Sequence, residues 1–555
     1  MMAYSLDDDD VDSVYTDSFS LTPSIMNGTS EGLDNRSNNK GSSVMGATFN
    51  FTNAIIGAGA MGLGGAIQVS GGLISIFSII FFGSLAKYSA DLIIFLTLHV
   101  QHQQSQEDLA SQRRRSGTQR NNNNDVSVVT YETLGQLSFG TVGIFCVVFS
   151  KAVYSFGCLV AYLIVIKDNF GSGLEGAIYG NTTSSGDADS FRQLLQNEIL
   201  LTAILSAIIV LPLCLFRSIG PLAKFSFISI LAMLSIAGIV LYLIIVNPGG
   251  NVRVESTGTV FEDWFEVKPG IFESLGTFVF TFVAQHTVHL TFESLKPKDR
   301  NFASWKRVSL FSILISGFVS LTVGVVVYMT FYQETRSDIF EMYPPSGAID
   351  AAKIFLSVSM LLTFALPFFT CREMIVVMIS QLCCGCSKNQ VRRNKRELGL
   401  RESLLRPATA LNDYDHDYIE GIESDDDAYE KNVLFLCDDE DDLLPVEQHG
   451  IIPPIPNKSW LISGEERQLV LPYHILLTVL LWGVTTALAL SAPSLGDVLD
   501  LVGCLSGTVI AFLLPGLFHL KLVGFSHLAV MMVVIGALVG SVGTYFSLRK
   551  LVMDV

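Results

Sequence analysis

The sequence predicts an all-α polytopic membrane protein with about eleven transmembrane helices. Of its 555 residues, 50% are hydrophobic and only 16% are charged, a composition that disfavours a soluble multidomain enzyme. Apolar runs of about 18 or more residues recur, each long enough to cross roughly 30 Å of hydrocarbon. These runs cover residues 47–69, 71–97, 139–166, 197–215, 223–246, 271–291, 308–331, 351–370, 469–491, 495–518 and 526–547.

The segments outside these runs are polar, and they hold most of the acidic residues behind the net charge of −17. Their composition predicts disorder in the N-terminal tail and in one long internal loop. The predicted organisation is a cytosolic tail 1–45, spans one to eight in 46–383, an acidic cytosolic loop 384–467, spans nine to eleven in 468–548, and a short tail 549–555.

Lysine and arginine set the predicted orientation, because cytosolic loops are enriched in these residues. They cluster at 113–120, 296–307 and 392–396, between spans two and three, between six and seven, and after span eight. These loops are therefore predicted to be cytosolic, with the N-terminus inside and the C-terminus outside. The opposite side carries the sequon Asn181-Thr182-Thr183, so Asn181 is a predicted glycosylation site.

A run of acids ending in Leu443 and Leu444 has the form of an acidic dileucine sorting signal. Its position in a predicted cytosolic loop favours trafficking adaptors as partners. The alternative is a chance pair of leucines in an acidic segment. The predicted location is the endolysosomal, vacuolar or plasma membrane.

The first apolar run contains glycines that a simple membrane anchor does not need. Gly57, Gly59 and Gly62 follow the polar residues Thr52 and Asn53, and each glycine costs about 1 kcal/mol relative to alanine inside a helix. Unwound backbone at membrane depth is tolerated in protein-lined or watery cavities, and such broken helices bind substrate in transporters. The same glycines match a dinucleotide-binding fingerprint, but that motif requires a preceding strand and a nearby acid.

The sixth run is interrupted in a similar way. Gln285, His286 and Thr287 separate the apolar residues 278–284 from the apolar residues that lead to Phe292. Interrupted segments at corresponding positions of two halves are the best sequence indication of a transporter site. An intramembrane enzyme is disfavoured, because the spans contain no paired carboxylates, metal-ligand set or nucleophile–base pair. We therefore expect no enzyme activity and no cofactor.

Four stretches, in a fixed order, carry a family resemblance: Phe49 to Leu63, Leu211 to Gly220, Phe280 to Leu295 and Leu362 to Glu373. Together they resemble the amino acid/auxin permease family, and specifically solute carrier family 38, the sodium-coupled neutral amino acid transporters. Two positions depart from the family pattern. Gly64 stands where the family usually has proline, and Gln285 stands where it usually has histidine.

The resemblance implies a LeuT-type fold, in which spans one to five and six to ten form inverted repeats and span eleven is peripheral. It also implies a substrate site at the two broken helices, formed by Asn53, Ile56, Gly57, Ala58, Gly59, Gln285 and His286. Asn53 and Thr363 align with family positions tied to sodium. The alternatives are close packing of small residues and ordinary hydrogen bonds between helices.

Lys151 lies near the middle of the predicted third span. An ammonium at the bilayer centre costs about 3 kcal/mol on insertion scales, and it usually marks a pathway or a relay. We therefore treat Lys151 as a proton-linked candidate. The alternative is a structural lysine that pairs inside the bundle or lies closer to the membrane surface.

The sequence thus predicts a secondary active amino acid transporter that works by alternating access, with neutral amino acids coupled to sodium or protons. The alternative is a membrane amino acid sensor with little net transport. The expected partners are the amino acid and membrane lipid, with no nucleic acid.

Overall fold

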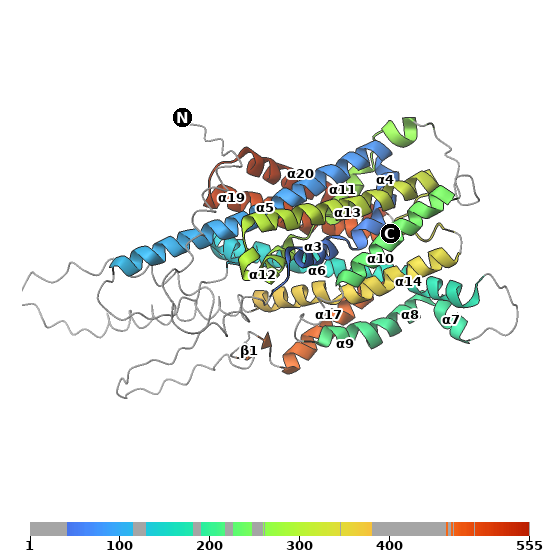
Figure 1. Cartoon of the computed structure of the whole chain (residues 1–555). Coiled ribbons are helices and arrows are strands. Elements are labelled where there is room, and N and C mark those ends of the chain that lie inside the picture. The colour runs from blue at the N-terminus through green and yellow to red at the C-terminus, as the bar shows by residue number, and fades with distance from the viewer. Residues whose placement is uncertain are drawn as a thin grey trace, which may run out of the picture. The chain divides into compact units, whose positions relative to one another are not determined.

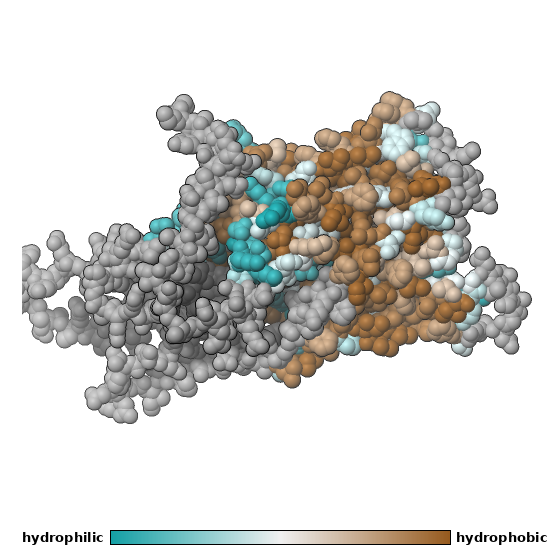
Figure 2. Space-filling view, viewed as in Figure 1, coloured by the Kyte–Doolittle hydropathy of each residue, from teal (hydrophilic) through white to brown (hydrophobic). Residues whose placement is uncertain are grey.

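The structure is a computed structural model that describes residues 41–114, 129–180, 190–216, 226–246, 259, 261–343, 346–379, 462–463, 468–469, 471–492 and 494–553. These residues are almost entirely helical (Figure 1). Within these ranges, nine helices are long and apolar enough to cross a membrane. Apolar side chains cover most of their visible surface, and hydrophilic ones gather toward one end (Figure 2).

The two remaining predicted spans are broken helices. Span one consists of α3 (Val44–Ile55) and α4 (Ala58–Ser70). Span six consists of α11 (Ile271–Phe280), the 3-10 turn η4 (Gln285–Thr287) and α12 (Val288–Ser294). Because each predicted apolar run now corresponds to a long helix or a broken one, the prediction of an all-α polytopic membrane protein is confirmed.

The other helices follow the predicted order. The first half contains α5 (Gly72–Arg114), α6 (Tyr131–Tyr179), α7 (Ser190–Gln196), α8 (Glu198–Leu205), η1 (Ser206–Val210), α9 (Leu211–Leu215) and α10 (Ser226–Val246). The second half contains η3 (Phe261–Phe265), η5 (Pro297–Asp299), α13 (Phe302–Phe331), η6 (Tyr332–Glu334), α14 (Gly347–Thr363) continued by helix 365–379, α17 (Leu471–Ser491), α18 (Leu495–Val502), η8 (Gly503–Gly507), η9 (Val509–Leu513), α19 (Leu514–Leu522) and α20 (His527–Met553). Two short strands, β1 (Ile462–Ser463) and β2 (Gln468–Leu469), pair antiparallel.

The packing of these helices follows a symmetric pattern. α5 packs on α13, and α6 packs on α14, which are spans two with seven and three with eight. The contact of α10 with α3 has its counterpart in that of α18 with α11, and the contact of α10 with α14 has its counterpart in that of α18 with α6. Each contact thus recurs when every span of one to five is replaced by its counterpart among spans six to ten. This correspondence favours the predicted inverted repeat.

The ends of the two broken spans lie together. Ser42, just before α3, donates its N–H to the Ser294 carbonyl at 2.7 Å, and Lys296 donates its N–H to the Ser42 carbonyl at 3.1 Å. The start of span one and the end of span six therefore lie on the same side. The chain crosses the membrane six times between these two points, so both must lie on the same side. The distribution of lysine and arginine predicts that this side is cytosolic.

The first helix of span six crosses span ten with almost no space between the backbones. A Cβ atom at Gly276 would overlap the Asp500 carbonyl, and one at Gly503 would overlap the Gly276 carbonyl. The Asp500 carboxylate accepts the Thr277 N–H at 2.9 Å and the Thr277 hydroxyl at 2.6 Å. Glycine is required here by close approach and not by an unusual backbone angle.

We predict that Gly276→Ala destabilises the protein by about 1–3 kcal/mol, the usual cost of overpacking. Gly317→Ala on α13 is the matched control, since nothing lies within 4 Å of its added Cβ, and it should leave stability unchanged or slightly raised. Thermal unfolding of the purified protein in detergent measures both. Equal midpoints for the two variants would contradict the close crossing.

Candidate functional site

Span one unwinds at two residues. Ile56 has an extended backbone and donates its N–H to the Thr52 carbonyl at 2.8 Å. Gly57 then begins α4 with no side-chain cap. The first N–H groups of a helix have no α-helical partners within that helix, and they lie at the positive end of the helix dipole. In α4, the third of them, the Ala60 N–H, bonds the Gly57 carbonyl at 3.3 Å. Ala58 and Gly59 form this first turn, and both are buried.

The break in span six is held by side chains. The Tyr154 hydroxyl donates to the Val283 carbonyl at 2.8 Å and lies 3.3 Å from the Phe280 carbonyl. The Gln285 amide accepts the Ala284 N–H at 3.0 Å and donates to the Ala86 carbonyl on α5 at 3.2 Å. Gln285 therefore joins the break to span two, and its predicted contact with substrate stays a prediction.

The two breaks meet at Gly59. A Cβ atom there would lie 2.8 Å from the Thr281 Cα and 3.1 Å from its backbone nitrogen. A Cβ atom at Gly57 would instead lie 2.8 Å from the Tyr162 hydroxyl on α6. The two glycines thus have different surroundings, because Gly59 abuts rigid backbone while Gly57 faces the tip of a side chain.

Several buried polar atoms around the breaks have no hydrogen-bond partner among the described residues. They are the Thr52 hydroxyl, the Asn53 Oδ1, the Ser155 hydroxyl on α6 and the His286 Nδ1. The His286 ring lies 5.2 Å from the Tyr154 ring, which itself bonds the break in span six. An unsatisfied buried polar group costs about 1–3 kcal/mol, so each of these atoms would be stabilised by a polar partner.

The sodium candidates lie in different environments. Thr363 ends α14, where its hydroxyl donates to the Ser359 carbonyl at 2.8 Å and lies 3.1 Å from the Ser229 hydroxyl on α10. The Ser229 and Ser359 hydroxyls are 2.5 Å apart. Asn53 is not among these partners. The structure therefore places Thr363 in a trio of hydroxyls between spans five and eight.

Lys151 has a partner that the sequence did not indicate. Its Nζ lies 2.5 Å from a carboxylate oxygen of Glu132, and both side chains are largely buried. The two residues are brought together because α6 reverses at Phe139 and Gly140, where the Gly140 φ is 60°. The alternative of a lysine paired inside the bundle thus has a specific partner, and the proton-linked role of Lys151 stays a prediction. Lys151→Met alone would leave the Glu132 carboxylate buried without compensation.

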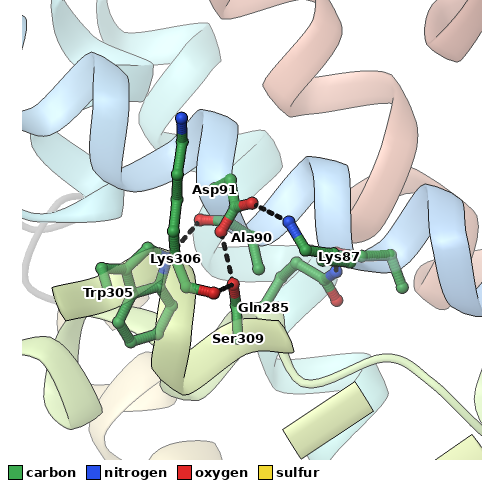
Figure 3. A network of polar contacts seen from close by, with 8 residues as sticks. Lys87, Ala90, Asp91, Gln285, Trp305, Lys306 and Ser309 are labelled. Atoms are coloured by element: carbon green, nitrogen blue, oxygen red, sulfur yellow. Dashed lines mark hydrogen bonds and ion pairs between the residues drawn. The ribbon is translucent and has the colours of Figure 1, made fainter. Parts of the chain in front are cut away.

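A second buried charge ties span two to span seven (Figure 3). Asp91 on α5 pairs with Lys87, one turn earlier, at 2.6 Å and accepts the Ser309 hydroxyl of α13 at 2.6 Å. Close by, the Trp305 indole donates to the Ala90 carbonyl at 3.2 Å. This network fixes α5 and α13 beside the break in span six.

The loop after α13 covers the opposite end of span one. A Cβ atom at Gly65 would lie 3.0 Å from the Ser337 backbone. Asp338 accepts the Phe340 N–H at 3.0 Å and the Asn169 side-chain N–H of α6 at 2.5 Å. Burial raises the pKa of the Asp338 carboxyl to about 6.

Sequence reasoning missed Glu132, Tyr154, Tyr162 and Asp338. Only Glu132 had an indication in the sequence, and it was chemical. A buried lysine such as Lys151 needs a carboxylate partner. The predicted glycosylation site Asn181 and the predicted sorting signal at Leu443 and Leu444 lie outside the described residues.

The chain resembles named amino acid transporters. Vacuolar amino acid transporter 2 of Saccharomyces cerevisiae is 26% identical over 64% of this chain and 65% of its own length. Vacuolar amino acid transporter 5 of the same yeast is 24% identical over 68% and 71%. Putative sodium-coupled neutral amino acid transporter 11 of Mus musculus is 26% identical over 60% and 64%. The matches therefore span about two thirds of each relative.

Residues 40–549 match the family described as transmembrane amino acid transporter protein. The match includes both broken helices and the ion pair of α6. It also agrees with the sequence prediction of a transporter rather than an enzyme. The chain is a multi-pass membrane protein and belongs to the transmembrane amino acid transporter family.

Proposed function

We propose that this protein is a secondary active amino acid transporter that works by alternating access. The observation that carries the proposal is the meeting of two broken helices at Gly59 and Thr281, in spans that also hold buried polar atoms without partners among the described residues. Broken helices at corresponding positions are the usual site of substrate and ion binding in such transporters. The named relatives transport amino acids, which supports the same substrate class here.

The substrate carboxylate binds at the start of α4, where the N–H groups of Ala58 and Gly59 point along the helix dipole. Asn53 and Ile56 line the preceding turn. The unsatisfied atoms of Thr52 and His286 accept hydrogen bonds, so they suit the substrate ammonium group. Neutral amino acids are the proposed cargo, in keeping with the relative from Mus musculus.

The driving ion is sodium or the proton, and each has candidate residues. Sodium prefers neutral and anionic oxygens, which Asn53 and the hydroxyl trio around Thr363 supply. A proton is carried instead by the buried pair of Lys151 and Glu132. The relative named as sodium-coupled supports the first choice.

We propose an endolysosomal or vacuolar membrane as the location, with the plasma membrane as the alternative. The vacuolar relatives and the acidic dileucine at Leu443 and Leu444 support an internal membrane. Trafficking adaptors that bind this dileucine are the proposed protein partners.

The decisive test is amino acid flux into proteoliposomes with sodium and proton gradients imposed separately. Glutamine or alanine should accumulate against its gradient under one of the two driving forces. Specific amino acid binding without flux under either gradient would overturn the proposal in favour of a sensor.

We predict that Gly57→Ala lowers amino acid affinity about tenfold, because the added methyl group collides with the Tyr162 hydroxyl and overpacking costs about 1–3 kcal/mol. The double variant Gly57→Ala/Tyr162→Phe should regain much of the affinity, since it removes the colliding oxygen. Gly59→Val is less informative, because its side chain would strike the Thr281 backbone and disturb the fold. Equilibrium binding of a radiolabelled amino acid measures the effect. A double variant as weak as Gly57→Ala would argue against a carboxylate site at the start of α4.

If sodium drives transport, Thr363→Val should raise the half-saturating sodium concentration roughly fivefold, as expected for one lost oxygen ligand worth about 1 kcal/mol. Thr370→Val is the matched control on the same helical segment, because that hydroxyl bonds its own helix at Leu366. Uptake as a function of sodium concentration measures both. Sodium-independent uptake by the unmodified protein would exclude the sodium assignment.

A further inference from the structure

The first residues of α6 form a separate short arm, which we define as Tyr131 to Ser138. The chain reverses at Phe139 and Gly140, and the Gly140 φ of 60° is a conformation that favours glycine. Among the described residues, nothing lies within 4 Å of a Cβ placed at Gly140, so this glycine serves the reversal and not packing. The short arm then packs on its own helix, since a Cβ at Gly143 would overlap the Gly135 carbonyl.

The short arm is fastened to the rest of α6 by the ion pair of Glu132 with Lys151. The Lys151 ammonium also lies 6.0 Å from the centre of the Tyr131 ring, within the range of a cation–π contact. Removing one partner of a buried pair is strongly destabilising, because the other charge is left uncompensated. Glu132 therefore determines where Tyr131 is held.

Tyr131 is fully buried and touches two separate parts of the molecule. Its hydroxyl donates to the Ile510 carbonyl of span ten at 2.8 Å, and its ring packs edge-on against Phe518 at 5.8 Å. Its ring also stacks on His289 of α12 at 6.1 Å. His289 in turn bonds the Thr97 hydroxyl of α5 at 2.8 Å. The short arm thus joins span ten to spans six and two.

These contacts lie on the side where span one begins and span six ends, as the pairing of Ser42 with Ser294 and Lys296 shows. A path from the breaks to that side requires α12 to part from α6, and this parting must break the contact of Tyr131 with His289. Two buried polar atoms there have no partner among the described residues, the Ser138 hydroxyl and the His289 Nδ1. Such atoms favour a second arrangement in which water satisfies them.

We propose that the short arm is the gate on the predicted cytosolic side, with Glu132 as the positioning residue that holds it closed through Lys151. The inference rests on the proposed function, since a gate requires a transport path. It adds an identified closing contact, Tyr131 against Ile510 and His289, and a hinge at Gly140.

The test uses Ser138→Cys as a reporter in the full chain, with its nine native cysteines replaced. The Ser138 hydroxyl is buried and makes no hydrogen bond, so the substitution removes no bond. A membrane-impermeant methanethiosulfonate is applied to each face of membrane vesicles, and the labelling rate is measured. When the short arm carries no change other than Ser138→Cys, the reporter should react slowly, and only from the cytosolic face.

The ion pair is first neutralised with both charges removed together, as Glu132→Gln/Lys151→Met, so that no charge is left buried alone. Labelling should rise on the order of tenfold, because loss of the pair shifts the population toward the open arm. The charge swap Glu132→Lys/Lys151→Glu should bring the rate back toward the starting value. The pair of Glu175 with Arg192, at the other end of α6, is the matched control, and Glu175→Gln/Arg192→Gln should leave labelling unchanged.

Tyr131→Phe is the second variant, for use if the protein with Glu132→Gln/Lys151→Met does not fold. It removes only the bond to the Ile510 carbonyl and should raise labelling severalfold. Unchanged labelling in Tyr131→Phe and in the neutralised pair, or labelling from the opposite face, overturns the gate. Labelling is read without transport, so a protein that fails the flux test but shows these changes retains the hinged arm and loses only its transport role.

Discussion

A helix that is interrupted inside a bilayer must find partners for its freed backbone groups within the protein, since hydrocarbon supplies none. This constraint is met differently at the two breaks. In span six, Tyr154 and Gln285 bond the carbonyls and the N–H that the break releases. In span one, the start of α4 has no side-chain cap, and Asn53 beside it is unsatisfied. The first break thus lacks partners that the zwitterionic substrate of the proposed function would supply.

The remaining architecture holds these breaks in place. Glycine allows the two broken helices to touch at Gly59, and a second glycine crossing joins span six to span ten. The buried Asp91 adds a polar link between spans two and seven (Figure 3). These contacts leave little freedom between the halves of spans one and six. Opening of either side is therefore better described as movement of this group against α6 than as bending at the breaks.

Each end of the proposed transport path is covered by a segment attached to or touching α6. Asp338 in the loop after span seven bonds Asn169 near one end of α6. At the other end, the short arm places Tyr131 against span ten and α12. The loop with Asp338 and the short arm both contact α6, so movement of this helix affects both ends. Contacts of one end are then well placed to depend on those of the other, as alternating access requires.

The fold was predictable from sequence because hydropathy is a local property, and the apolar runs and their interruptions could be read directly. The break in span one was predictable for the same reason at Gly57 and Gly59, and its role as a substrate site stays a prediction. The features that sequence reasoning missed depend on contacts between residues that are distant in sequence. Glu132 lies before the predicted start of span three, and only the reversal at Gly140 brings it to Lys151.

Hydrogen-bond partners were likewise hidden from the sequence. Gln285 was expected at the substrate site from the family resemblance, and its bonds to Ala284 and Ala86 could not be read from the sequence. Thr363 carried a family resemblance to sodium sites, yet sequence contained no signal for its neighbour Ser229 on another span. Local patterns identify where a polar residue is unusual, whereas its partner is set by the tertiary fold.

The buried pair on α6 also connects the gate to the choice of driving ion. Two buried charges compensate each other, so loss of the Glu132 charge leaves the Lys151 charge without its partner. If a proton drives transport and binds the Glu132 carboxylate, the Lys151 ammonium keeps the Tyr131 ring as its nearby compensation. In the proposed gate, that protonated state would favour a raised arm, because lifting the arm admits water to the ammonium. The hydroxyl trio around Thr363 has no comparable connection to Tyr131, so an ion bound there would have to act on the gate through the helices themselves.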